Sequence, residues 1–212
     1  MLKLTRRRDL IAIARSMNEI GLNQGASGNV SVRHGDAILI TPSGLSYERC
    51  TPEDMVRLAM DGTAEGIRKP SSEWHLHLDI YETRPEAGAV LHAHSPWCTT
   101  LACLDREIPP FHYMVAMAGG DTIRCAPYAQ FGSKELSNNV TAALKRRTAC
   151  LMSHHGMVCY AENLEKVLDL AIEVENLARV YCQALQLGKP SLLDGDQMNE
   201  VLAKFADYRS CS

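Results

Sequence analysis

Apolar residues recur at three- and four-residue intervals in two long segments, one near each end of the chain. This spacing places them on one face of a helix. It predicts a helix over residues 5–21 and a longer one over residues 163–187. Gly188 and Pro190 are expected to end the second helix, because glycine is favoured just after a helix and proline cannot continue it.

Shorter segments show the alternation or clustering of apolar residues that is typical of strands. The predicted strands cover residues 29–33, 37–40, 89–94 and 150–154, and a further strand at 157–160 continues after Gly156.

Two more helices are predicted from signals at their N-termini. Thr51-Pro52-Glu53 places proline at the first helical position, where its missing N–H is not needed. Pro70-Ser71-Ser72-Glu73 opens a helix that is expected to end near Thr83. Helices and strands alternate without a linker or an internal repeat, so the sequence predicts one layered α/β domain spanning residues 1–212.

Composition and charge narrow the classes of partner. The net charge is −3 and charged residues make up 22% of the chain, which does not favour nucleic acid or an anionic membrane as partner. No apolar run approaches the ~18 residues of a membrane span, and we find no secretion signal. We therefore expect a cytoplasmic protein whose cysteines are reduced core thiols. These are Cys50, Cys98, Cys103, Cys125, Cys150, Cys159, Cys182 and Cys211.

Histidines form the clearest candidate site. His92 and His94 are two residues apart in a predicted strand, so their imidazoles point to the same face and suit a single metal ion. Zinc binds imidazole nitrogens and keeps an open position in catalytic sites. His154-His155-Gly156 offers a third ligand, and the spacing does not decide between His154 and His155.

The competing interpretation is that a His-x-His pair consists of ordinary polar strand residues. The remaining histidines are expected to be structural or exposed. They are His34, His75, His77 and His112.

Three segments of small residues are candidates for binding an anion. Ser71 and Ser72 lie at a predicted helix N-terminus, where free N–H groups and the helix dipole favour a phosphate. Ser43-Gly44 and Gly28-Asn29 are further turns that expose the backbone. Taken singly, each segment is more simply explained by capping or turn formation. Glu73, in the first turn, is either an ordinary helix-start acid or a general base near the metal.

Taken together, six segments resemble the class II aldolase/epimerase family, and most closely its L-fuculose-1-phosphate aldolase branch. The likeness covers essentially the whole chain, and the combination is much more specific than any one segment. The segments are GASGNVSVR (25–33), ITPSGLSY (40–47), PSSEW (70–74), LHAHSP (91–96), GGDTIRCAPY (119–128) and HHG (154–156).

The resemblance implies a single α/β domain with a central, mainly antiparallel sheet flanked by helices. It implies a homotetramer whose active sites lie between neighbouring subunits. The expected reaction is retro-aldol cleavage of a (deoxy)ketose 1-phosphate to dihydroxyacetone phosphate and a short aldehyde. One Zn²⁺, or another divalent metal, would be bound per subunit by His92, His94 and His155, with Glu73 as the catalytic acid/base.

The resemblance also assigns the substrate-binding positions. Tyr113 would reach in from the next subunit and exchange a proton with the aldehyde oxygen, while Phe131 and Tyr208 would line the aldehyde pocket. Expected substrates are of the L-fuculose 1-phosphate, 5-deoxyribulose 1-phosphate or 5-methylthioribulose 1-phosphate type. The phosphate would be bound by Asn29, Ser43, Gly44, Ser71 and Ser72.

One departure and several alternatives accompany the resemblance. Ala26 stands where the family aldolases carry a threonine, and Ser27 is the candidate replacement.

The alternative functions differ from an aldolase in their residues. Sugar-phosphate 4-epimerases of the family carry Asp in place of Glu73 and have a longer C-terminal region. A methylthioribulose-1-phosphate dehydratase has similar zinc ligands, whereas the adducin-like binding module lacks the zinc histidines. A structural zinc site would normally be closed by four ligands, often cysteines.

Overall fold

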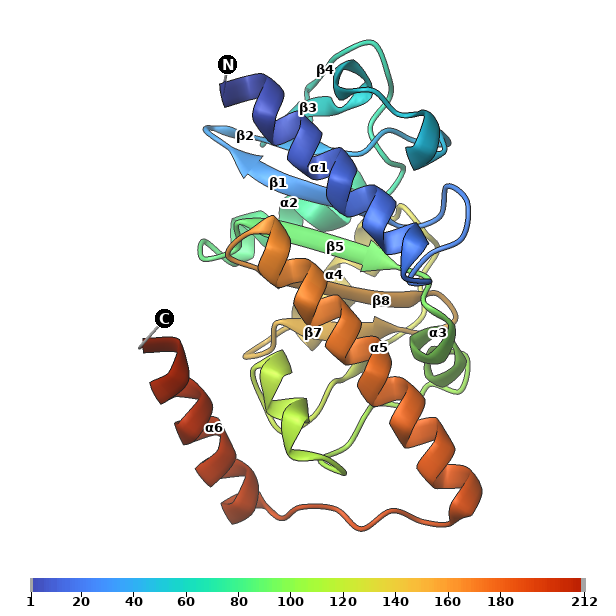
Figure 1. Ribbon diagram of the computed structural model, residues 1–212, viewed down its shortest axis with the longest axis vertical. Coiled ribbons are helices and arrows are strands. Elements are labelled where there is room, and N and C mark those ends of the chain that lie inside the picture. The colour runs from blue at the N-terminus through green and yellow to red at the C-terminus, as the bar shows by residue number, and fades with distance from the viewer. Residues whose placement is uncertain (1, 211–212) are drawn as a thin grey trace.

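A mainly antiparallel sheet of eight strands runs through the centre of the protein, in a computed structural model that describes residues 2–210 (Figure 1). The strand order is β4-β3-β2-β1-β5-β8-β7-β6, and among the strands of the described residues only the β6–β7 pair is parallel. This confirms the expected α/β fold with a mainly antiparallel sheet. The strands are β1 Asn29–His34, β2 Ala37–Ile40, β3 Val56–Ala59, β4 Ala64–Glu65, β5 Ala89–Ala93, β6 Cys125–Ala126, β7 Ala149–Met152 and β8 Gly156–Ala161.

Helices cover both faces of this sheet. On one face pack α1 (Leu2–Glu19), α3 (Pro96–Ala102) and α5 (Leu164–Leu187), together with the 3-10 helix η3 (Tyr113–Ala118). The opposite face carries α2 (Trp74–Thr83) and α4 (Lys134–Ala143).

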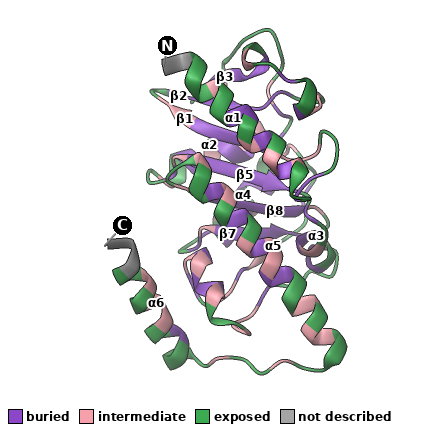
Figure 2. Cartoon of the chain, in the orientation of Figure 1, coloured by how far each residue is buried: buried purple, intermediate pink, exposed green. Residues whose placement is uncertain are grey.

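The central strands are buried between the two helical layers, as Figure 2 shows, so alternate residues along them enter different cores, whereas the edge strand β4 is exposed. In β5, Leu91 enters the core under α5 and Val90 enters the core under α2. His92 therefore faces the α2 side of the sheet, as Val90 does.

Two of the helix starts predicted from the sequence are wrong. The segment after Thr51 forms only a single 3-10 turn, η2 (Pro52–Asp54), because Asp54 closes a capping box with Thr51 and the chain then enters β3. Helix α2 begins at Trp74 and not at residue 70. The Ser71 hydroxyl accepts the Glu73 N–H at 3.3 Å, which holds the preceding residues in a turn. Another 3-10 turn, η1 (Tyr47–Arg49), was not predicted.

The last elements of the chain also lie outside the sequence prediction. After α5 the chain runs in extended form and then enters α6 (Gly195–Ser210), which contacts η3 (Figure 1). The expected strand over 150–154 ends at Met152, since Ser153 to His155 form a turn. The predicted long helix is confirmed, with Asn163 as its N-cap.

Cysteine burial agrees only in part with the expectation of core thiols. All seven described cysteines are free, and Cys50, Cys98, Cys150 and Cys159 are buried. Cys103 is exposed, so the expectation is wrong for that residue, and Cys211 lies outside the described residues. Within residues 2–210, no helix combines the length and the apolar character needed to cross a bilayer.

Candidate metal centre and active site

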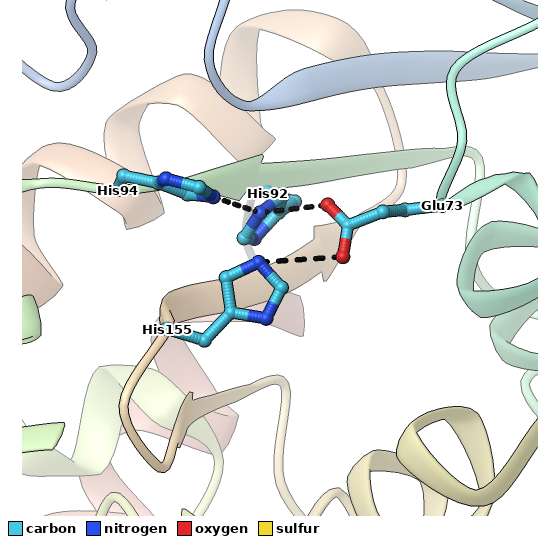
Figure 3. A group of neighbouring side chains, drawn as sticks. All are labelled: Glu73, His92, His94 and His155. Carbon is cyan, nitrogen blue, oxygen red and sulfur yellow. Dashed lines mark hydrogen bonds and ion pairs between the residues drawn. The ribbon is translucent and has the colours of Figure 1, made fainter. Parts of the chain in front are cut away.

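Three imidazole rings meet at one point on the α2 side of the sheet. The ring centroids of His92, His94 and His155 lie 4.8 Å apart in every pair (Figure 3). The Nε2 atoms of His92 and His94 are 2.9 Å apart. With a carboxylate oxygen of Glu73, the possible ligand atoms all lie within 4.8 Å of one another. The structure thus brings His155 to the cluster, a choice that the spacing of His154 and His155 had left open.

Each histidine is held by different backbone features. His92 lies within β5, between β1 and β8, and its side chain is fully buried. His94 follows the last residue of β5, and its N–H donates a hydrogen bond of 3.0 Å to Asn23 Oδ1. His94 remains exposed, so the cluster is open on its side.

The β7–β8 turn positions the third imidazole. His154 has a φ of +54°, in the left-handed region, which reverses the chain so that His155 faces the cluster. Glycine is required at the next position because a Cβ on Gly156 would lie 2.3 Å from the carbonyl oxygen of Ala93. The β5 and β8 backbones can therefore approach closely enough for His92 and His155 to meet.

Glu73 closes the buried side of the cluster. It occupies the N-cap position of α2 with a relative exposure of 5%. Its Oε2 lies 3.0 Å from His92 Nε2, and its Oε1 lies 3.3 Å from His155 Nε2 (Figure 3). Among the described residues, Oε1 has no hydrogen-bond donor. A buried carboxylate oxygen without a donor calls for a positive charge nearby.

The donor set fits a divalent cation. His92 Nδ1 lies 2.8 Å from the Met157 carbonyl oxygen, which can only accept a hydrogen bond, so Nδ1 carries a proton. In a neutral ring this leaves the lone pair of Nε2 directed at the cluster, the arrangement that metal-binding histidines adopt. Three imidazole nitrogens beside a carboxylate, open on one side, match the ligands of a catalytic zinc site.

The pKa shifts favour neutral outer imidazoles and an ionised Glu73. Burial and the neighbouring His92 lower the pKa of His94 and of His155 to about 4. Burial alone would raise the pKa of Glu73, but the charges and hydrogen bonds of the neighbouring imidazoles and Asn29 together outweigh it and hold the pKa well below its ordinary value. Burial alone would lower the pKa of His92, but the Glu73 carboxylate and the hydrogen bond to the Met157 carbonyl oxygen together raise it.

A cavity of about 330 Å³ opens beside the cluster and contains all five positions that the resemblance assigned to phosphate. Glu73, His94 and His155 also line it, so these segments, distant in sequence, share one space with the imidazoles. None of its described lining residues is lysine or arginine. The five positions are Asn29, Ser43, Gly44, Ser71 and Ser72.

The loop that carries Ala26 also reaches this cavity. Ala26 and Ser27 both line it. The Ser27 hydroxyl donates a hydrogen bond of 2.7 Å to the Gln24 carbonyl oxygen. Because this bond uses its only proton, the Ser27 hydroxyl is not placed to donate to a phosphate.

The three aromatic positions expected to contact the aldehyde differ in placement. Phe131 lines the cavity and is 64% exposed. Tyr113 begins η3 and is 50% exposed, and it does not line the cavity of its own chain. Tyr208 lies in α6, but its side chain is outside the described residues.

Sequence reasoning missed two residues near the site. Tyr128 lines the cavity and packs edge-on against His154 at a centroid distance of 6.0 Å. His77, expected to be structural or exposed, is fully buried and bonded to Asn29. A signal for His77 was present, since it follows Glu73 by four residues and so lies on the same face of the helix.

Comparisons with known proteins point to one family. The model of the Class II Aldolase and Adducin N-terminal domain matches residues 8–182. A 5-methylthioribulose-1-phosphate/5-deoxyribulose-1-phosphate aldolase of Rhodospirillum rubrum is 50% identical over 206 residues, covering 97% of this chain and 93% of its own. An L-fuculose phosphate aldolase of Escherichia coli (strain K12) is 47% identical over 202 residues, covering 95% and 94%.

A solved structure leads to the same family. An L-fuculose 1-phosphate aldolase superposes with a TM-score of 0.91 at 38% identity, covering 94% of this chain and 95% of that one. The family match, two relatives similar over nearly their full length, and this shared fold show that the chain belongs to the class II aldolase family.

Proposed function

We propose that this protein is a zinc-dependent aldolase that cleaves a ketose 1-phosphate into dihydroxyacetone phosphate and a short aldehyde. The observation that carries the proposal is the convergence of His92, His94 and His155 with Glu73 at the edge of one cavity. The names of the relatives from Rhodospirillum rubrum and Escherichia coli support the same substrate class.

The reaction breaks the C3–C4 bond of the sugar. A divalent cation held by the three imidazoles supplies Lewis acidity, which stabilises the negative charge that develops on the substrate oxygens. The bonding electrons remain on the three-carbon fragment, and a proton must then be added to its C3 carbon. Glu73, an ionised carboxylate beside His92 and His155 at the edge of the cavity, would take up a proton from solvent and transfer it to C3.

The second proton belongs to the C4 hydroxyl, which becomes the aldehyde oxygen. Tyr113 of a neighbouring subunit would relay this proton, accepting it from the C4 hydroxyl while its own phenolic proton passes to water. The small residues of the cavity would bind the phosphate and hold the reacting carbons in place. Since no described lysine or arginine lines the cavity, neutral hydrogen-bond donors would bind the phosphate.

The aldehyde half of the substrate would lie against Phe131 and Tyr208. One methylene group in such an apolar pocket discriminates by only ~1–3 kcal/mol. We therefore expect cleavage of more than one substrate of the L-fuculose, 5-deoxyribulose or 5-methylthioribulose 1-phosphate type.

Product analysis tests the proposed function. The zinc-loaded protein is incubated with each of these three phosphates, and the products are separated. Free dihydroxyacetone phosphate together with the matching aldehyde is expected. An epimer of the starting sugar would indicate a 4-epimerase instead, and loss of water without carbon–carbon cleavage would indicate a dehydratase.

Removal of the metal is expected to abolish activity without unfolding the protein. The imidazoles are held by β5 and the β7–β8 turn, which pack between two apolar cores that do not depend on a cation. Activity and far-UV circular dichroism are followed during chelation, and Zn²⁺ is then added back. Recovery of activity with an unchanged spectrum is expected, whereas unfolding on chelation would indicate a structural zinc site.

Active sites that are shared between subunits predict complementation. Because Tyr113 does not line the cavity of its own chain, we propose that a homotetramer brings it to the neighbouring site. Tyr113→Phe and Glu73→Gln are expected to be nearly inactive when assayed separately. After mixed refolding, part of the activity returns, because some sites combine an intact Glu73 with an intact Tyr113. No recovery in verified mixed oligomers would place both residues in one chain's site.

We also propose the cytoplasm as the compartment of this protein, because its described cysteines are free thiols.

A further inference from the structure

A buried line of hydrogen bonds leads from the candidate site into the layer under α2. Asn29 Nδ2 lies 3.2 Å from Glu73 Oε2, and His77 Nε2 lies 2.5 Å from Asn29 Oδ1. On its other side, His77 Nδ1 lies 2.6 Å from Ser31 Oγ, which is 2.9 Å from the Tyr81 hydroxyl. All five of these residues are buried, with relative exposures of 5% or less.

The secondary structure places these residues in register. Glu73, His77 and Tyr81 are four residues apart and lie on one face of α2. Asn29 and Ser31 are two residues apart and point to one face of β1. The helix face and the strand face are therefore joined, with His77 as the central contact.

The hydrogen bonds can run in one direction only. An ionised carboxylate is an acceptor, so the Asn29 amide must direct its NH₂ group at Glu73. Its Oδ1 then accepts from His77, which fixes the proton of His77 on Nε2. Nδ1 is left to accept from the Ser31 hydroxyl, and Ser31 accepts from Tyr81. His77 is neutral in this scheme, in agreement with a pKa that burial lowers to about 3.

We propose that His77 is a positioning residue that fixes the orientation of the Asn29 amide and, through it, the Glu73 carboxylate. With the amide reversed, Oδ1 would lie against Glu73 Oε2, and two acceptors would repel each other. His77 lies behind Asn29 and does not line the cavity, so it acts without touching substrate. The inference rests on the proposed role of Glu73 in proton transfer.

Two substitutions that place an amide at position 77 distinguish a positioning role of His77 from a packing role. In His77→Gln the amide can reach the place of Nε2 and still donate to Asn29, whereas in His77→Asn it reaches only the place of Nδ1, beside Ser31. Loss of a partner behind a site residue typically costs about 10- to 100-fold in activity. We expect His77→Asn to lose that much kcat with little change in KM, and His77→Gln to retain most of the kcat. Equal losses in the two variants would overturn the proposal.

A matched control variant removes a side-chain hydrogen bond that lies outside the candidate site. Tyr160 donates a hydrogen bond of 3.0 Å to Glu86, away from the cavity. Tyr160→Phe is therefore expected to keep the wild-type kcat. A kcat loss in Tyr160→Phe as large as that in His77→Asn would assign the effect to general packing and overturn the proposal.

The second measurement does not need the aldolase reaction. Side-chain ¹H–¹⁵N NMR of the metal-free and zinc-loaded protein reports the tautomer of His77 directly. A neutral ring with its proton on Nε2 is expected in both forms, and a proton on Nδ1 or a charged ring would overturn the proposal. A protein that cleaves none of the offered sugars but shows the expected tautomer would contradict the proposed function and leave the hydrogen-bond direction standing.

Discussion

Replacing Glu73 with glutamine is expected to lower turnover by about 10²- to 10⁴-fold, the usual contribution of a positioned acid or base. The substitution keeps the shape of the side chain but removes its negative charge and its capacity to transfer a proton. The three imidazoles are unchanged, so the protein should still bind its metal. Single-turnover kinetics with a cleavable sugar phosphate, together with metal analysis of the same sample, measure the two effects separately.

The control for this variant is a glutamate of the same chemistry outside the site. Glu135 lies in the first turn of α4 and is exposed, so Glu135→Gln should leave both turnover and metal content unchanged. If Glu73→Gln turned over substrate at a rate near that of the wild type, Glu73 would have no part in proton transfer. Loss of metal along with activity would instead make Glu73 a ligand.

The second large expected effect is a loss of metal affinity when His155, but not the adjacent His154, is replaced in the β7–β8 turn. His155→Ala removes one of three converging imidazoles and should lower metal affinity by at least 10- to 100-fold, since even a residue that only supports a ligand typically costs that much. Activity should fall with the metal content. Equilibrium titration with Zn²⁺ and elemental analysis after dialysis measure the change in affinity.

His154→Ala is the matched control for metal binding. Its ring packs against Tyr128 at a centroid distance of 6.0 Å and is not part of the imidazole cluster. Its metal content should therefore equal that of the wild type. Equal losses of metal in His154→Ala and His155→Ala would point to a disrupted turn as the cause, and loss only in His154→Ala would reverse the assignment of the third imidazole.

Much of the fold could be predicted from local pattern. The long helix over 164–187 appeared in the apolar spacing because it buries one regular face, and the strands near residues 30, 38, 90 and 158 appeared as short apolar segments because they are buried on both faces. The helix starts at Thr51 and Pro70 failed for one reason. Serine, threonine and proline satisfy turns and 3-10 segments as well as helix N-termini, so the local signal does not separate them.

By itself, the sequence determined the ingredients of the site: two imidazoles at strand spacing, a histidine pair before a glycine, and small residues in three turns. The tertiary structure decided which of them meet. His155 faces the cluster because His154 adopts a left-handed conformation and Gly156 allows the β8 backbone to approach β5. Likewise, the role of His77 depends on its contact with Asn29, 48 positions away in the chain. Such contacts arise from the pairing of distant strands and the packing of a helix across them, which no local spacing records.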